Sequence, residues 1–96
     1  MLKANGQVLP ILTPRPAVEN IDANTLTESG IYICTTGCSS LPKSIGDWTT
    51  LFVIPVKTPG GNLDYVIQLA ISVTTGKTAV RRSFRGDWTD WKPIKA

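Results

Sequence analysis

The residue types best suited to chemistry lie near the carboxyl end of the chain, where indole rings and charges alternate. Trp88 and Trp91 flank Thr89-Asp90, and two arginines, Arg81 and Arg85, precede them. An exposed indole with guanidinium groups beside it can bind a sugar, and the same composition suits the stacking of single-stranded bases. Tryptophan also fills cores and subunit interfaces. The candidate ligand contacts are Trp48, Tyr65, Arg81, Arg85, Trp88 and Trp91.

Catalytic groups are scarce. The chain has no histidine, which removes the commonest general base and most zinc and non-haem iron sites. The carboxylates lie mostly in turns or at strand ends, Asp64 among them, where we expect them to stay solvated. The serines and threonines have no base partner, and Gly76-Lys77-Thr78 lacks the upstream glycine of a phosphate-binding loop. We therefore predict no enzymatic activity, no catalytic residue and no cofactor.

The cysteine pair, Cys34 and Cys38, does not indicate a metal site. Two thiols cannot fill a tetrahedral zinc site alone, and the sequence offers neither histidine nor further cysteine. A disulfide across so short a span needs a tight turn through Gly37. We expect free, part-buried thiols in a reducing compartment.

The charge balance is weakly positive and unevenly spread. Lys plus Arg is 10 and Asp plus Glu is 7, a net charge of +3, and most of the excess follows position 76. Nucleic-acid-binding proteins usually carry a stronger excess, so we expect these charges to be solvated strand edges. No apolar run approaches the ~20 residues of a membrane-spanning helix, and we expect no membrane insertion.

Two short motifs indicate turns. Arg85-Gly86-Asp87 spells an adhesion tripeptide, but a turn between two strands uses the same residues. Gly46-Asp47-Trp48-Thr49 recurs as Gly86-Asp87-Trp88-Thr89. In both copies glycine and aspartate suit the turn, and tryptophan suits the start of a strand that covers one end of the core.

The rest of the pattern predicts an all-β domain, a small antiparallel meander of about five strands with an extended N-terminal arm. Tyr65 to Val73 alternates heavy apolar residues with a lighter set, which is the period of a strand. Asp22 can cap a single helical turn before the first strand. Sequential hairpins favour a meander over a βαβ layout. The expected strands are 31–34, 48–57, 65–73, 78–85 and 88–94.

The chain divides into residues 1–20, an extended connector or arm, and residues 21–96, the β domain. Pro10, Pro14 and Pro16 disfavour a helix or a central strand in the arm. Its apolar residues cannot be buried by the arm alone, so we expect it to pack on a neighbouring chain or a preceding domain.

Several of these residues together resemble a known family. They are Leu26 followed by Gly30-Ile31-Tyr32, an apolar strand entered by Trp48, Gln68 in the third strand, and the closing stretch Arg82-Ser83-Phe84-Arg85-Gly86-Asp87-Trp88-Thr89-Asp90-Trp91-Lys92. This pattern is similar to that of the pyocin-knob type domain of bacteriophage tail fibres and phage-derived bacteriocins. The resemblance covers about Ile21 to Ile94 and is most specific from Arg82 to Trp91, while the Cys34 to Cys38 segment departs from the family.

The resemblance implies a virion tail-fibre module, made in the bacterial host cytoplasm, that contributes to attachment to a bacterial surface saccharide. It also implies a homotrimer, other tail components as partners, and structural roles for Trp88 and Trp91. Three copies about an axis would bury the arm and cover the sheet edges. The alternatives are a nucleic-acid-binding small β-barrel and a purely structural fibre spacer or cap without a ligand.

Overall fold

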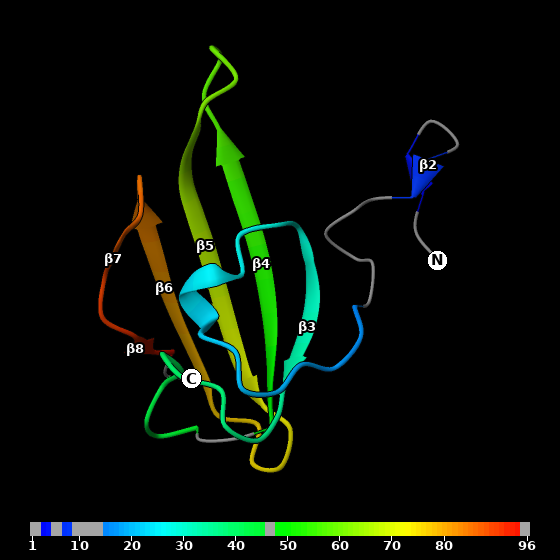
Figure 1. Cartoon of the computed structure of the whole chain (residues 1–96), viewed down its shortest axis with the longest axis vertical. Coiled ribbons are helices and arrows are strands. Elements are labelled where there is room, and N and C mark those ends of the chain that lie inside the picture. Colours follow the sequence, from blue (N-terminus) through cyan, green and yellow to red (C-terminus); the bar gives the residue numbers. More distant parts are fainter. Residues whose placement is uncertain (1–2, 5–6, 9–14, 46–47, 95–96) are drawn as a thin grey trace.

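The computed structural model describes residues 3–4, 7–8, 15–45 and 48–94. An antiparallel sheet in meander order dominates it (Figure 1), which confirms the predicted all-β class. The order is β3-β4-β5-β6-β7, and β8 also pairs with β6. Within the described residues the helical content is one 3-10 turn, η2. The elements are β1 (Lys3–Ala4), β2 (Gln7–Val8), η2 (Ala23–Thr25), β3 (Gly30–Cys34), β4 (Thr49–Lys57), β5 (Leu63–Ser72), β6 (Thr78–Phe84), β7 (Asp87–Trp88) and β8 (Lys92–Pro93).

Local sequence signals account for most of these boundaries. The Asp22 side chain caps η2 by accepting a hydrogen bond from the Asn24 backbone N–H at 2.9 Å. Gly76 closes the β5–β6 hairpin with φ +74°, a conformation that glycine adopts without steric cost. Pro55 lies where β4 has passed the end of β3, because Gly30 pairs with Val53, so proline here interrupts no β3–β4 ladder bond. The cap by Asp22 agrees with the sequence prediction.

The prediction of a single last strand over 88–94 is wrong. β7 pairs with Ser83 and Phe84, while β8 pairs with Ala79 and Val80. The residues between β7 and β8 belong to no strand, although Thr89 still bonds the Arg82 backbone in both directions. This break decides where the last two tryptophans lie. Residues three apart on an ideal strand point to opposite faces, whereas both indoles here pack against the same core.

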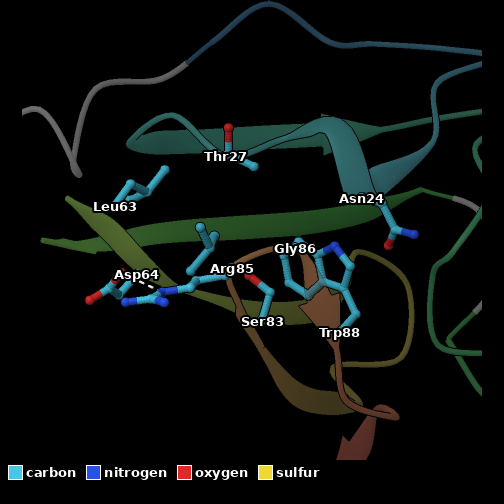
Figure 2. A pocket seen from close by; sticks show the side chains of 9 residues that line it. Asn24, Thr27, Leu63, Asp64, Ser83, Arg85, Gly86 and Trp88 are labelled. Carbon is cyan, nitrogen blue, oxygen red and sulfur yellow. Dashed lines mark hydrogen bonds and ion pairs between the residues drawn. The ribbon is translucent and has the colours of Figure 1, made fainter.

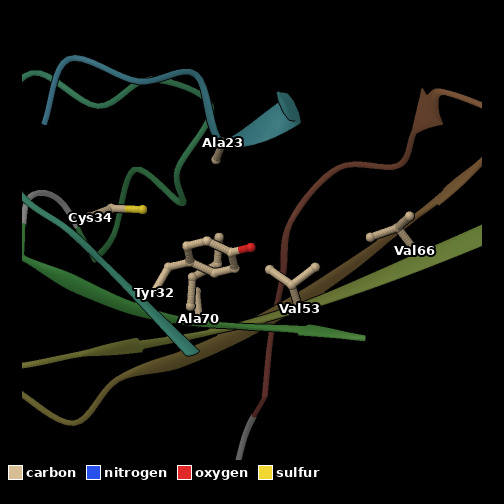
Figure 3. Packing of buried hydrophobic residues seen from close by; sticks show 7 residues of the cluster. Ala23, Tyr32, Cys34, Val53, Val66 and Ala70 are labelled. Atoms are coloured by element: carbon tan, nitrogen blue, oxygen red, sulfur yellow. The ribbon is translucent and has the colours of Figure 1, made fainter. Parts of the chain in front are cut away.

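One face of the sheet is covered by irregular chain. The segment after residue 15 runs parallel to β3, with Arg15 N–H donating to the Ile31 carbonyl and Val18 N–H to the Ile33 carbonyl. η2 and the loop after β3 then cross this face of the sheet (Figure 1). Figure 3 shows the buried cluster between these layers. Its members are Ala23, Tyr32, Cys34, Leu51, Val53, Val66 and Ala70.

The larger apolar side chains lie on the opposite face of the sheet, away from the covering chain. Along β5 the buried positions are Asp64, Val66, Gln68, Ala70 and Ser72, whereas the alternate, heavier positions are half-buried or exposed. The same alternation runs through β3, β4 and β6. We call the second side the open face, because no described strand or helical turn is stacked on it (Figure 1). Its apolar members are Ile31, Ile33, Phe52, Ile54, Val56, Tyr65, Ile67, Leu69, Ile71, Val80 and Phe84.

Candidate functional site

Arg81 is a buried structural residue rather than a surface contact. Its side chain lies between two indoles, with the guanidinium carbon 4.0 Å from the Trp88 ring centroid and 4.6 Å from that of Trp91. Such stacking stabilises a cation that has lost water. The residue is 6% exposed, and burial lowers the pKa of Arg81 to about 10, an effect that the carboxylate of Asp22 opposes.

Gln68 links Arg81 to the chain around η2, which covers this face of the sheet. Its amide nitrogen donates to the carbonyls of Ala23 at 2.8 Å and Leu26 at 3.0 Å, and its amide oxygen accepts from Arg81 Nε at 2.9 Å. The side chain is fully buried, so these bonds replace all of its hydration. The indole nitrogen of Trp91 likewise donates to the Ser40 carbonyl at 2.9 Å. Two residues proposed as ligand contacts, Arg81 and Trp91, therefore hold the loops on the sheet.

A second arginine lies at the edge of a pocket. Arg85 and Gly86 form the two-residue connection of the β6–β7 hairpin, with φ of +50° and +92°. Positive φ at both central residues is the geometry of a type I′ turn, where asparagine and glycine are the favoured residues. Arginine is strained in this position. The turn predicted at Arg85-Gly86-Asp87 is confirmed, and Arg85 is the residue of this turn that is held in an unfavourable backbone conformation.

Asp64 holds the strained arginine. The Arg85 backbone N–H donates to the Asp64 carbonyl at 2.8 Å, and Arg85 Nε donates to Asp64 Oδ1 at 3.1 Å (Figure 2). The Asp64 side chain is 11% exposed, while that of Arg85 is 65% exposed. The expectation that Asp64 is solvated is therefore wrong, because the end of β5 lies under the turn. Most of the Arg85 side chain stays exposed, with the guanidinium carbon 5.1 Å from the Phe84 ring centroid.

Polar groups, the aliphatic side chains of Leu63 and Val66 and the Trp88 ring line this turn pocket, which has a volume of about 270 Å³. Figure 2 shows Trp88 and Ser83 on one side and Asn24 and Thr27 on the other. The volume lies near the lower end of the range for small-molecule sites, which suits one sugar ring rather than a long chain. Its lining residues are Asn24, Thr27, Leu63, Asp64, Val66, Ser83, Arg85, Gly86 and Trp88.

Two other sequence candidates lie away from the turn pocket. Trp48 precedes β4, is 53% exposed, and accepts a backbone hydrogen bond from Val73 at the end of β5. Its predicted role as a cover for the core is wrong, whereas Trp88 does cover the core. Gly46 and Asp47 of the same motif lie outside the described residues. Tyr65 is on the open face, with its ring centroid 5.1 Å from that of Phe84.

The sequence analysis missed the polar residues that line the turn pocket together with Arg85. Asn24 comes from η2, Thr27 from the chain that follows it, and Asp64 from β5. No spacing in the sequence relates these positions, because the meander brings them together across the covered face. The only local signal was the aspartate that follows the Gly60-Gly61-Asn62 turn.

The thiols are free, and burial, with Cys38 close by, raises the pKa of Cys34 to about 12. Among the described residues, no group of three histidine, cysteine or acidic side chains is placed to hold a metal ion. No helix in that part of the chain is long and apolar enough to cross a membrane. Comparison of the chain with protein families, curated proteins and solved structures gives no match.

Proposed function

We propose that this chain is a non-enzymatic module of a bacteriophage or prophage tail fibre that attaches to a bacterial surface saccharide. It would act in the virion tail as a homotrimer, in contact with other tail components. The sequence resemblance suggests the setting, and the turn pocket supports binding. We assign saccharide contact to Arg85 and Trp88, with Asn24, Thr27 and Ser83 as hydrogen-bonding groups around them.

The observation that carries this proposal is the strained, exposed arginine at the pocket. An asparagine at position 85 would satisfy the turn at lower conformational cost. Arginine instead places a planar cation at the rim of a pocket that also holds an indole and several amide and hydroxyl groups, with the guanidinium turned toward Asp64 (Figure 2). Guanidinium groups bind vicinal hydroxyls and carboxylates through paired N–H donors, and Trp88 offers an apolar ring surface. Both features suit a sugar.

The barrel alternative has less support from the fold. In the described sheet, β3 and β7 lie at opposite ends of the strand order, so the sheet does not close on itself. A nucleic-acid-binding barrel needs such closure or near-closure. Retention on single-stranded DNA that falls steeply with added salt would nevertheless favour it over saccharide attachment.

The direct test replaces Arg85 with asparagine. Because asparagine favours the type I′ turn, we expect Arg85→Asn to fold while it removes the guanidinium together with its bond to Asp64, and circular dichroism checks the fold. We expect labelled wild-type protein to bind some members of a panel of bacterial strains and purified surface polysaccharides. Loss of charged hydrogen bonds should weaken that binding roughly tenfold to a hundredfold in the variant.

Arg82→Asn is the matched control, since Arg82 is an exposed arginine of the same region that does not line the turn pocket. It should leave binding unchanged. Equal binding by Arg85→Asn and wild type would show that the pocket is not the attachment site. A wild-type chain that binds no strain or polysaccharide in the panel would favour the spacer or cap.

A further inference from the structure

The open face carries more apolar bulk than the face that forms the core. On β5 the covered positions include Val66, Ala70 and Ser72, whereas Ile67 and Leu69 lie on the open face. An antiparallel sheet with one solvated face normally places polar residues on that face. Here the heavier apolar set points away from the covering loops, so the sheet has a second surface suited to burial.

Strand register arranges these side chains in continuous rows. One row crosses four strands as Ile31, Phe52, Leu69 and Val80, each directly opposite the next. A second row brings together Val56, Tyr65 and Phe84, which are 39%, 36% and 42% exposed. Residues directly opposite on neighbouring strands have touching side chains, so these rows form one patch rather than scattered exposed groups.

Cations lie around this patch, where the guanidinium carbon of Arg85 is 5.1 Å from the Phe84 ring centroid and that of Arg82 is 5.9 Å from the Tyr65 ring centroid. Arg82 ends the row that begins with Ile54 and Ile67, and Lys92 of β8 pairs with Val80 beyond the last long strand. Across β3 to β6 the open face carries no carboxylate. The centre can therefore lose water without the desolvation of an ion, which is the arrangement of an interface core with a polar rim.

We propose that a second copy of this chain packs on the open face, face to face. At about 3.3 Å per residue and about 4.8 Å between strands, β3 to β6 present a face of roughly 500 Å². Two such faces bury about 1,000 Å² in total, which is about the minimum for a biological interface and below the roughly 1,200 Å² at which stable interfaces begin. A flat apolar sheet is complementary to another sheet of the same twist, as in β-sandwiches. This surface differs from the arm and sheet edges that the sequence suggested, and it does not depend on saccharide binding.

Edge pairing is a weaker route to association on the β3 side. The chain from residue 15 to 18 already lies along β3 and uses the carbonyls of Ile31 and Ile33. An incoming strand would have to displace it. The face has no such occupant among the described elements, so copies that meet through the face keep all of these backbone hydrogen bonds.

The test is the mass in solution, measured by light scattering after size exclusion. Because face-to-face packing joins copies, or homotrimers, in pairs, we expect wild type at an even multiple of 10.4 kDa, and three times 10.4 kDa would overturn the proposal and leave the homotrimer to the arm and the sheet edges. Phe52→Lys with Leu69→Lys places charges at the centre of the face, and it should raise the dissociation constant roughly a hundredfold or more, leaving a folded monomer. Leu63→Lys is the control, because Leu63 is a 42% exposed apolar residue of the same strand that lines the turn pocket instead. It should keep the wild-type mass.

Circular dichroism reports whether each variant folds. If the double variant unfolds, Thr50→Lys decides, since it adds charge to the same face while every apolar side chain stays. A 10.4 kDa wild type, or a folded face variant with the wild-type mass, overturns the proposal and leaves the face to another segment or another protein. Arg85→Asn should keep the wild-type mass, so loss of saccharide binding and loss of association are separate results.

Discussion

Replacing Gln68 with methionine removes the side-chain bonds between η2 and the sheet while it keeps nearly the same volume. The variant loses two bonds from Nε2 to the Ala23 and Leu26 carbonyls, and one bond from Arg81 Nε to Oε1. The Ala23 carbonyl keeps a partner, because the Leu26 N–H also donates to it at 3.1 Å. The guanidinium of Arg81 keeps its two indoles and the attraction of the Asp22 carboxylate.

The magnitude follows from these three bonds. Each neutral bond contributes about 1 kcal/mol net and the bond to the charged group about 2 kcal/mol, so we expect a loss of about 3–4 kcal/mol of unfolding free energy. For a domain of this size the loss corresponds to roughly 15–25 °C in Tm. No cavity penalty is added, since methionine fills a similar space.

A double-mutant cycle with Arg81→Met isolates the buried pair. Unfolding in urea, followed by tryptophan fluorescence, gives the free energies of both single variants and of the double variant. Once Arg81 is gone, Gln68→Met no longer strands a buried cation, so the double variant should be more stable than the sum of single effects implies, by about 2 kcal/mol. Additivity within about 0.5 kcal/mol would refute the link between Gln68 and Arg81.

Two further predictions concern the end of β3 and the loop that follows it. Gly37 has φ +80°, and a Cβ there would collide with Asn20 Oδ1, so Gly37→Ala should cost about 2–3 kcal/mol in urea unfolding. Gly76→Ala, with φ +74° and open space around it, should cost only about 1 kcal/mol, and equal losses would contradict the role of the Asn20 contact. Because burial raises the pKa of Cys34 to about 12, we expect iodoacetamide at pH 8 to leave this thiol unmodified in the folded chain and to alkylate it in urea. Intact and peptide masses measure both states, and similar rates with and without urea would show that Cys34 is accessible.

Local sequence patterns predict much of the fold. The period-two run of β5, the glycine in the β5–β6 hairpin and the Asp22 cap depend on neighbours within a few residues. Their energies are set before any long-range contact forms, so the sequence alone indicates strands, turns and meander order. The turn at Arg85-Gly86 belongs to the same set.

The candidate site was only partly predictable. Arg85 and Trp88 were chosen for their chemistry, and both line the turn pocket. Arg81 and Trp91 were chosen for the same chemistry but serve as framework, because the break between β7 and β8 turns both indoles toward one buried cation. The three-residue spacing of Trp88 and Trp91 does not reveal such a break, because strand periodicity assumes an unbroken strand.

Tertiary structure alone decided which face of the sheet is covered. Alternation divides a strand into two faces but does not say which one meets the rest of the chain. That choice comes from bonds between distant residues, such as Gln68 to Ala23 and Trp91 to Ser40, which hold η2 and the β3 loop on the lighter side. Those contacts span more than forty residues, so no local sequence pattern reports them. The sequence by itself therefore determined an alternating sheet with two distinct faces, and the long-range contacts determined that its heavier face stayed open.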